Sequence, residues 1–331
     1  MGTLPGSLPL AERIDVDPQF WWLLDLLGDL TLDTETLADT RAGFEALSAA
    51  IPAPDVPGLV VEDRSVPGAP GDPDVGVRLY LPERGAFPTP ALLWIHGGGM
   101  VMGSPSASDL TVRNAVAHLG WPVVSVDYRL APETPFPGPL DDCTAAFDWL
   151  AGAAGELGID PARIGVVGES AGGGLAAGLA LRCRDRAAAA PALQVLVYPM
   201  LDDRTVVRPD PSPHLGRDVW TPALNRFGWS AYLGVEPGSA GVDPAAAPAR
   251  IEDPAGLPPT FISVGALDLF LEEDVDYARR LARAGVPVEL HVFPRTPHGF
   301  AGLLGTSPLA DEHALVLLAA LRRELGGGDR D

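Results

Sequence analysis

Short apolar runs alternate with helical patterns along most of this chain, and no other feature limits the possible folds as strongly. Eight runs have the length and residue types of strands, and most of the later ones are apolar almost throughout, as is typical of strands covered on both faces. They are Val60–Val66, Val75–Leu81, Ala91–His96, Val123–Asp127, Ile164–Gly168, Gln194–Tyr198, Thr260–Gly265 and Val288–Phe293. Helical patterns lie between them, around Ser106–Leu119, Leu140–Ala153, Leu175–Arg184, Leu271–Ala284 and Pro308–Leu325. The alternation predicts an α/β fold with a mostly parallel, eight-stranded sheet and helices on both faces.

Two segments lie outside this alternation. The pair Asp17-Pro18 predicts a helix start, with a capping side chain followed by proline at the first helical position. Two helical patterns, Gln19–Leu30 and one after Asp33, precede every expected strand. About sixty residues then separate the strand ending at Tyr198 from the one beginning at Thr260, and a connection of that length is usually a functional insertion.

These segments suggest a division of the chain. The expected parts are N-terminal cap helices over residues 1–55, an α/β core over 56–200 and 251–325, a cap insertion over 201–250, and a disordered tail over 326–331. Four tryptophans lie in the two cap segments (Trp21, Trp22, Trp220 and Trp229), joined by Phe20, Phe227 and Tyr232. We expect these aromatic residues to meet over one edge of the sheet and enclose a small, water-poor pocket.

Composition excludes several classes of function. The 331 residues carry a net charge of −21, spread along the chain, which disfavours nucleic acid and anionic membranes as partners. All 23 basic residues are arginine, so a Walker phosphate loop, a Schiff-base lysine and a Ser–Lys dyad are excluded. The sequence shows neither a signal-peptide pattern nor an apolar run of membrane-spanning length, which favours a cytoplasmic protein. A homodimer is left open.

The two cysteines, Cys143 and Cys183, both fall in helical patterns. We expect them to be reduced core residues rather than a disulfide. Because no cysteine–histidine cluster has the spacing of metal ligands, we expect a protein that needs no metal and no cofactor.

The pattern Gly168-Glu169-Ser170-Ala171-Gly172 lies where an expected strand meets an expected helix. Small residues two positions on either side of Ser170 allow a tight turn that presents its hydroxyl. The free N–H groups of the following helix would also favour negative charge there. A glycine-rich helix start without chemistry is the alternative. We take Ser170 as the candidate nucleophile.

A serine nucleophile needs a base, and the six histidines can be ranked by position. His118 and His313 lie in helical patterns, His214 in the insertion, and His291 on the face of a strand. His298 lies in a loop just after the last strand, at the edge where sites form in parallel sheets. Asp268 follows the preceding strand and reaches the same edge. We predict His298 as the base and Asp268 as the carboxylate that orients it, whereas Glu272, Glu273 and Asp274 are expected to serve a helix N-terminus.

A glycine run, His96-Gly97-Gly98-Gly99, follows another expected strand at this edge. Consecutive glycines allow backbone N–H groups to point at an oxyanion without obstruction by side chains. With the N–H of Ala171 they would form a three-donor site. The alternative, a phosphate loop, lacks the lysine and the glycine spacing that such loops use.

Together these motifs resemble the hormone-sensitive-lipase-like branch of the α/β-hydrolases, the bacterial family IV esterases. The order Ser170, Asp268, His298 along the chain is that of α/β-hydrolases. Further matching stretches are Gly103-Ser104, the segment from Asp127 to Glu133, Gly168 to Gly173, and His298-Gly299-Phe300. The resemblance covers nearly everything from Val60 onward. It implies carboxylester hydrolysis without a cofactor, an oxyanion hole at Gly98, Gly99 and Ala171, and a lid made of both cap segments.

The sequence departs from that family at two positions. Glu169 replaces an aspartate that is common beside the serine, and Met100 stands where an aromatic residue often follows the glycines. Neither departure removes a catalytic group, but both concern the shape of the pocket. We expect the segment from Asp127 to Glu133 to brace the loop beneath the site.

Three candidate functions are compatible with these sequence features, and they can be ranked. The expected function is hydrolysis of short- to medium-chain acyl esters through an acyl-enzyme. An amidase or peptidase of the same fold is the runner-up, although no propeller repeat or acidic anchor pair marks a peptidase. A non-catalytic, lidded small-molecule receptor is the third, and retention of His298 argues against it.

Overall fold

The computed structural model describes residues 15–27, 30–83, 88–187, 189–301 and 307–327. Eight strands form one sheet in the order β1-β2-β4-β3-β5-β6-β7-β8. The first two pairings of this order, β1 with β2 and β2 with β4, are antiparallel, and all the others are parallel. The predicted mostly parallel, eight-stranded sheet is therefore confirmed.

The strands lie close to where the apolar runs place them. Their bounds are β1 Val60–Val66, β2 Val75–Leu81, β3 Thr89–Ile95, β4 Val123–Asp127, β5 Ile159–Glu169, β6 Leu193–Val197, β7 Thr260–Gly265 and β8 Val288–Phe293. Strand β5 begins five residues before the expected start at Ile164, because Thr89 of β3 pairs with Ile159 ahead of a register shift. The central strands β3, β6 and β7 are buried along almost their whole length.

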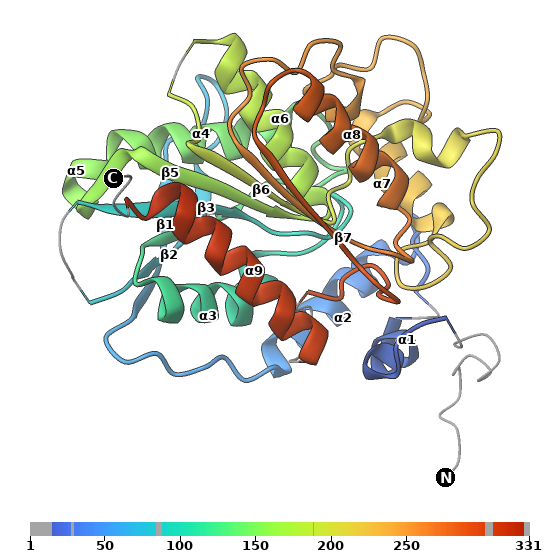
Figure 1. Cartoon of the computed structure of the whole chain (residues 1–331), viewed down its shortest axis with the longest axis horizontal. Coiled ribbons are helices and arrows are strands. Elements are labelled where there is room, and N and C mark those ends of the chain that lie inside the picture. Colours follow the sequence, from blue (N-terminus) through green and yellow to red (C-terminus); the bar gives the residue numbers. More distant parts are fainter. Residues whose placement is uncertain (1–14, 28–29, 84–87, 188, 302–306, 328–331) are drawn as a thin grey trace.

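Helices cover both faces of the sheet (Figure 1). One face carries α3 (Asp109–Leu119) and α9 (Pro308–Leu325), whose apolar residues share a core cluster with the N-terminal Phe20, Leu23 and Leu24. The other face carries α4 (Gly138–Gly152), α6 (Ala171–Asp185) and α8 (Leu271–Arg283). A single turn, α5 (Ala154–Leu157), leads into β5. The cores of both faces thus rest on the sheet, as expected for buried parallel strands.

Two helices precede the sheet, and both pack beside the end where β5 meets α6. Helix α1 (Trp21–Leu27) follows a short turn capped by the side chain of Asp17, which accepts from the Gln19 N–H at 3.2 Å. Helix α2 (Leu37–Ala50) buries only Leu37 fully and turns several of its other residues toward a cavity described below. Most of α2 therefore covers a space rather than packing into the core.

The long connection between β6 and β7 carries α7 (Pro222–Leu233) and two short 3₁₀ turns, Asp203–Val207 and Pro248–Arg250. Its two ends meet: the Arg250 guanidinium donates to both carboxylate oxygens of Asp203, at 2.6 and 2.8 Å. Asp203 is wholly buried. A buried charge of this kind is stable only when it is paired and hydrogen-bonded, so this ion pair holds the two ends of the connection together.

Cys143 and Cys183 are buried, free thiols, as expected. Among the described residues, no helix is both long and apolar enough to span a membrane. The end of the expected tail, residues 328–331, and the first fourteen residues lie outside the part of the chain that the structure describes.

Candidate active site

Ser170 occupies a strained turn between β5 and α6. Its φ of 55° and ψ of −119° are uncommon for a residue with a side chain. The turn holds because its backbone is bonded on both sides: Ser170 N–H donates to Val197 O, while Ser170 O accepts from the N–H groups of Gly173 and Met200. Residues of β6 and of the connection that follows it therefore hold the turn in its conformation.

Glycines flank this turn for steric reasons. A Cβ on Gly168 would lie 2.1 Å from the Gly172 carbonyl oxygen, and one on Gly172 would lie 2.1 Å from the Ile95 carbonyl oxygen. Both contacts are with backbone, which cannot rotate away. Any side chain at either position would push strand and helix apart, so the sequence requirement that we inferred for the turn has a direct structural cause.

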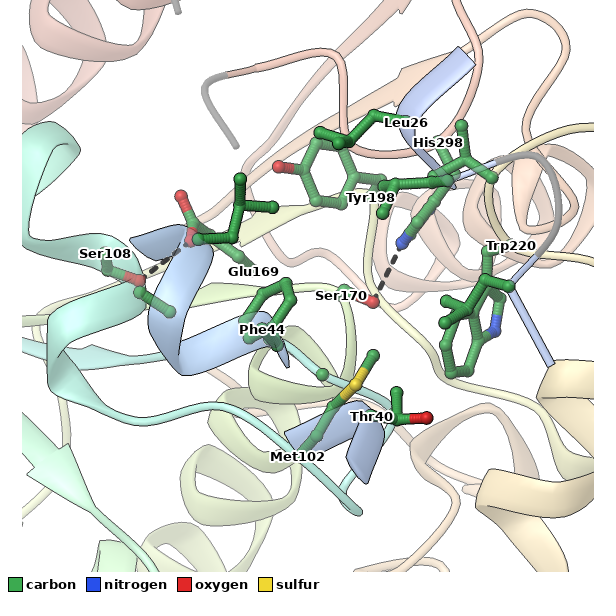
Figure 2. A pocket seen from close by; sticks show the side chains of 18 of the residues that line it. Leu26, Thr40, Phe44, Met102, Ser108, Glu169, Ser170, Tyr198, Trp220 and His298 are labelled. Atoms are coloured by element: carbon green, nitrogen blue, oxygen red, sulfur yellow. Dashed lines mark hydrogen bonds between the residues drawn. The ribbon is translucent and has the colours of Figure 1, made fainter. Parts of the chain in front are cut away.

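The structure brings the predicted serine, histidine and aspartate into one hydrogen-bonded chain. Ser170 Oγ lies 2.9 Å from His298 Nε2 (Figure 2), and His298 Nδ1 lies 2.7 Å from Asp268 Oδ2. All three side chains are almost fully buried, with exposed fractions of 6%, 5% and 0% respectively. With a neutral imidazole, Ser170 donates to His298, which donates in turn to Asp268.

The histidine and the aspartate are fixed from several directions. The other carboxylate oxygen of Asp268 accepts from the Phe270 N–H at 3.0 Å. The rings of Tyr198 and Phe270 contact the imidazole edge-on, with centroids 4.8 and 5.1 Å away. These contacts leave the imidazole little freedom to turn away from Ser170.

The glycine run and the start of α6 together place three backbone N–H groups near the serine. Gly98 and Gly99 have φ values of 120° and 62°, which residues with side chains rarely adopt. Among the described residues, the N–H groups of Gly98, Gly99 and Ala171 donate to no other protein group. Free N–H groups in this position are suited to bind an oxyanion.

His96 shapes this loop from below. Its side chain is fully buried and stacks on Tyr128 with centroids 4.2 Å apart, and its Nδ1 lies 2.8 Å from the Gly97 carbonyl oxygen. Burial lowers the pKa of the imidazole to about 4, so His96 is neutral at physiological pH. It supports the glycine loop and does not reach the cavity.

A cavity of about 370 Å³ opens above Ser170. Figure 2 shows Trp220 to one side of the serine, Phe44 and Glu169 to the other, and Met102 below it. Its further lining comes from the N-terminal region, with Leu26, Leu27, Leu30, Thr40, Gly43 and Leu47, and from Val219, Ala107, Ser108, Thr111 and Tyr198. Both regions outside the strand–helix alternation thus contribute to its walls.

The aromatic residues of the two cap segments are placed differently from our expectation. Trp220 lines the cavity, and its ring lies so close to Gly99 that a Cβ there would approach it to 2.3 Å. Trp229 and Tyr232 are instead buried in the core beside Phe136, and Trp22 is 41% exposed. Apart from Trp220, Phe44 and Thr40, the cap walls are mostly aliphatic, because α1 and α2 turn leucines toward the cavity.

The two departures from the family pattern have separate locations. Met100 is fully buried in the core and is not among the residues that line the cavity, whereas Met102 is. Glu169 lines the cavity directly. Only Glu169 therefore changes the surface that a substrate would touch.

Glu273 and Asp274 lie in the first turn of α8, as expected, but the hydrogen bonds of Glu273 go to another segment. Both are buried, and Glu273 Oε1 accepts from the N–H groups of Leu201 and Asp202, at 2.7 and 3.0 Å. The Thr205 hydroxyl donates to its other oxygen. Burial raises the pKa of Glu273 to about 8 and that of Asp274 well above its usual range. Glu273 holds the start of the insertion against the core.

The segment from Asp127 to Glu133 braces the loops under the site, as expected. Arg129 binds Asp142 through paired hydrogen bonds of 2.7 to 3.0 Å. From α2, Arg41 donates to the carbonyl oxygens of Val101 and Ala131, at 2.7 and 2.8 Å, and forms a two-pronged ion pair with Glu133. The sequence analysis did not identify Arg41, since an arginine on a helix is ordinarily a surface residue.

The α/β-hydrolase fold family matches residues 92–302. Esterase LipI of Mycobacterium tuberculosis is 38% identical over 82% of this chain and 84% of its own length, and Carboxylesterase NlhH of the same species is 35% identical over 96% and 98%. A solved bacterial heroin esterase has a TM-score of 0.88 and 41% identity, covering 95% of this chain and 99% of that one.

The family match spans well over half of the chain, and these relatives cover nearly its whole length. The fold, the glycine run and the strained serine turn agree with that match. The chain is a member of the α/β-hydrolase family, in its hormone-sensitive-lipase-like branch of esterases.

Proposed function

We propose that this protein is a carboxylesterase that hydrolyses short- to medium-chain esters through a Ser170–His298–Asp268 triad. The hydrogen-bonded chain of these three residues at the floor of a largely apolar cavity carries the proposal. The names of relatives support it, among them the ethyl acetate hydrolase of Pseudomonas putida, 34% identical over 87% of this chain.

In the first half of the proposed reaction, Ser170 Oγ attacks the ester carbonyl carbon while His298 Nε2 takes its proton. Asp268 holds the imidazole in the required tautomer and stabilises the imidazolium. Negative charge develops on the carbonyl oxygen, where the N–H groups of Gly98, Gly99 and Ala171 would receive it. The C–O bond to the alcohol then breaks, the alcohol takes the proton from His298, and an acyl-Ser170 ester remains.

In the second half, a water molecule loses a proton to His298 and attacks the acyl carbon. When the second tetrahedral intermediate collapses, its bond to Ser170 Oγ breaks, His298 returns the proton to Oγ, and the carboxylic acid leaves. Each half-reaction uses the same base and the same oxyanion site.

The size of the cavity supports the proposed range of substrates. At about 370 Å³, it lies near the lower end of the range of about 300–1,000 Å³ for ligand pockets. Its aliphatic walls favour an acyl or alkyl chain, since burial of each CH₂ group contributes about 0.8 kcal/mol. A long acyl chain would extend beyond these walls and gain nothing further.

A fluorophosphonate probe and a panel of p-nitrophenyl esters test the proposal. The wild type should gain one label at Ser170 and hydrolyse acetate to octanoate esters faster than longer ones. Ser170→Ala should take no label and lose roughly 10⁴- to 10⁶-fold in kcat. Labelling that persisted in Ser170→Ala, or wild-type activity on amides above that on matched esters, would contradict it.

A further inference from the structure

Glu169 brings a carboxyl group into a cavity that is otherwise largely apolar. It immediately precedes Ser170 in the chain, and its side chain lines the same cavity. Figure 2 shows the carboxyl group pointing away from the serine, toward Ser108 at the start of α3. The Ser108 hydroxyl donates to Oε2 at 3.2 Å. The acid is therefore within the substrate's space but outside the proposed catalytic chain.

Other polar groups gather at this end of the cavity. Thr111 lines it one turn along α3 from Ser108, and Tyr198 lines it from the turn after β6. Burial, and then the nearby Glu169 carboxylate, raise the pKa of the Tyr198 phenol well above its usual range. Glu169, Ser108, Thr111 and Tyr198 together form what we call the polar corner.

The polar corner has no basic side chain to balance the acid. The described residues that line the cavity include no arginine, and the chain contains no lysine at all. Burial raises the pKa of Glu169 to about 7, because the charged form loses hydration without gaining an ion pair. A cation placed beside it would supply the missing partner, and in a water-poor site that attraction is weakly screened.

We propose that Glu169 is the anionic end of a substrate subsite, so that this enzyme prefers esters whose alcohol or acyl part carries an ammonium group. The inference rests on the proposed ester hydrolysis and adds the charge of the substrate. Where the ammonium group carries N–H bonds, the oxygens of Ser108, Thr111 and Tyr198 can also accept hydrogen bonds from it. Anionic esters are disfavoured for the same reason, since a second carboxylate would meet Glu169 without a counter-charge.

A purely structural role for Glu169 makes a different prediction. As a brace between the serine turn and α3, it would affect all substrates equally through the position of Ser170. A charge-selective role instead changes the ratio between substrates that differ only in charge. The ratio is therefore the informative quantity, because any general loss of activity cancels in it.

Isosteric ester pairs supply that ratio. Acetylcholine and 3,3-dimethylbutyl acetate differ by a quaternary nitrogen in place of carbon in the alcohol. The p-nitrophenyl esters of 4-(trimethylammonio)butanoate and 5,5-dimethylhexanoate differ in the same way in the acyl part. We define the cation preference as kcat/KM of the cationic ester divided by that of its neutral isostere, measured at about pH 8.5, where Glu169 is ionised. It should exceed one in at least one pair and fall roughly tenfold in Glu169→Gln.

Glu273→Gln is the matched control, since Glu273 is a buried glutamate that does not line the cavity. It should leave the cation preference unchanged. An independent measurement needs no variant: choline should inhibit the wild type at lower concentration than 3,3-dimethylbutanol does. A cation preference that Glu169→Gln leaves intact, or choline that inhibits no better than the neutral alcohol, overturns the inference. Failure of the wild type to hydrolyse the neutral esters would instead contradict the proposed function.

Discussion

The floor and the roof of the cavity are built on different physical principles. The floor, which comprises the serine turn and the glycine run, is held by backbone hydrogen bonds and by glycines whose missing side chains admit neighbouring carbonyl groups. The roof, which comprises α1, α2 and the connection around α7, is held by a few polar side chains and lines the cavity mostly with aliphatic and aromatic ones. Substitutions in the floor are therefore expected to distort the backbone of the site. Side chains of the roof can change while the backbone of the floor stays in place.

A glycine-to-alanine substitution in the floor and one in the roof should show the difference between the two regions most clearly. Gly172→Ala places a methyl group 2.1 Å from the Ile95 carbonyl oxygen, so we expect a loss of several kcal/mol in stability and of nearly all activity. Gly43→Ala, on the roof helix α2, meets nothing within 4 Å. It should stabilise the protein by about 0.5–1 kcal/mol and alter the preference for acyl length. Thermal unfolding measures the stability of the two variants, and a panel of esters measures their preference for acyl length. Equal destabilisation by the two substitutions would contradict the proposed difference between floor and roof.

Glu273 ties the insertion half of the roof to the core, and its attachment should depend on pH. Its pKa in the folded protein, about 8, lies above the ordinary value of 4.5, so the folded state holds the proton more tightly. The stability that this gives is fully present below about pH 4.5 and is lost as the pH rises through about 8. Glu273→Gln stays neutral and should therefore gain stability relative to the wild type from pH 5 to pH 9. Melting temperatures across that range test this, and a constant difference would show that Glu273 does not titrate as stated.

Arg41 ties the N-terminal half of the roof to the loops beneath the site, and its removal should have a smaller effect. Arg41→Ala removes hydrogen bonds to Val101 and Ala131 and the ion pair with Glu133. We expect a loss of about 1–3 kcal/mol and a rise in KM that exceeds the fall in kcat. Glu133→Gln removes the exposed charge alone and should cost less than about 1 kcal/mol. If both variants had equal effects, the bonds to the backbone carbonyls would not be what holds α2.

The same contrast explains what could be predicted from the sequence. Strands and the serine turn follow from apolar runs and glycines, whose effects are local, so β2, β4, β7 and β8 lie where expected. The proximity of Ser170, Asp268 and His298 was predictable because parallel strands end at one edge. Arg41, Tyr198 and Ser108 were not identified, since their contacts join segments 60 to 100 residues apart, for which the sequence carries no local signal. The sequence correctly indicated that Glu169 affects the pocket, but it did not indicate which wall of the cavity its side chain lines.

The buried Asp203–Arg250 pair closes the ends of the insertion on one another, and this has a consequence for engineering. A segment whose two ends are held together in this way can be exchanged as a unit, because a replacement needs only to begin and end at the same spacing. A chimera that keeps both residues and takes the intervening chain from a relative would retain its nucleophile turn unchanged. Its substrate range would then come from the donor.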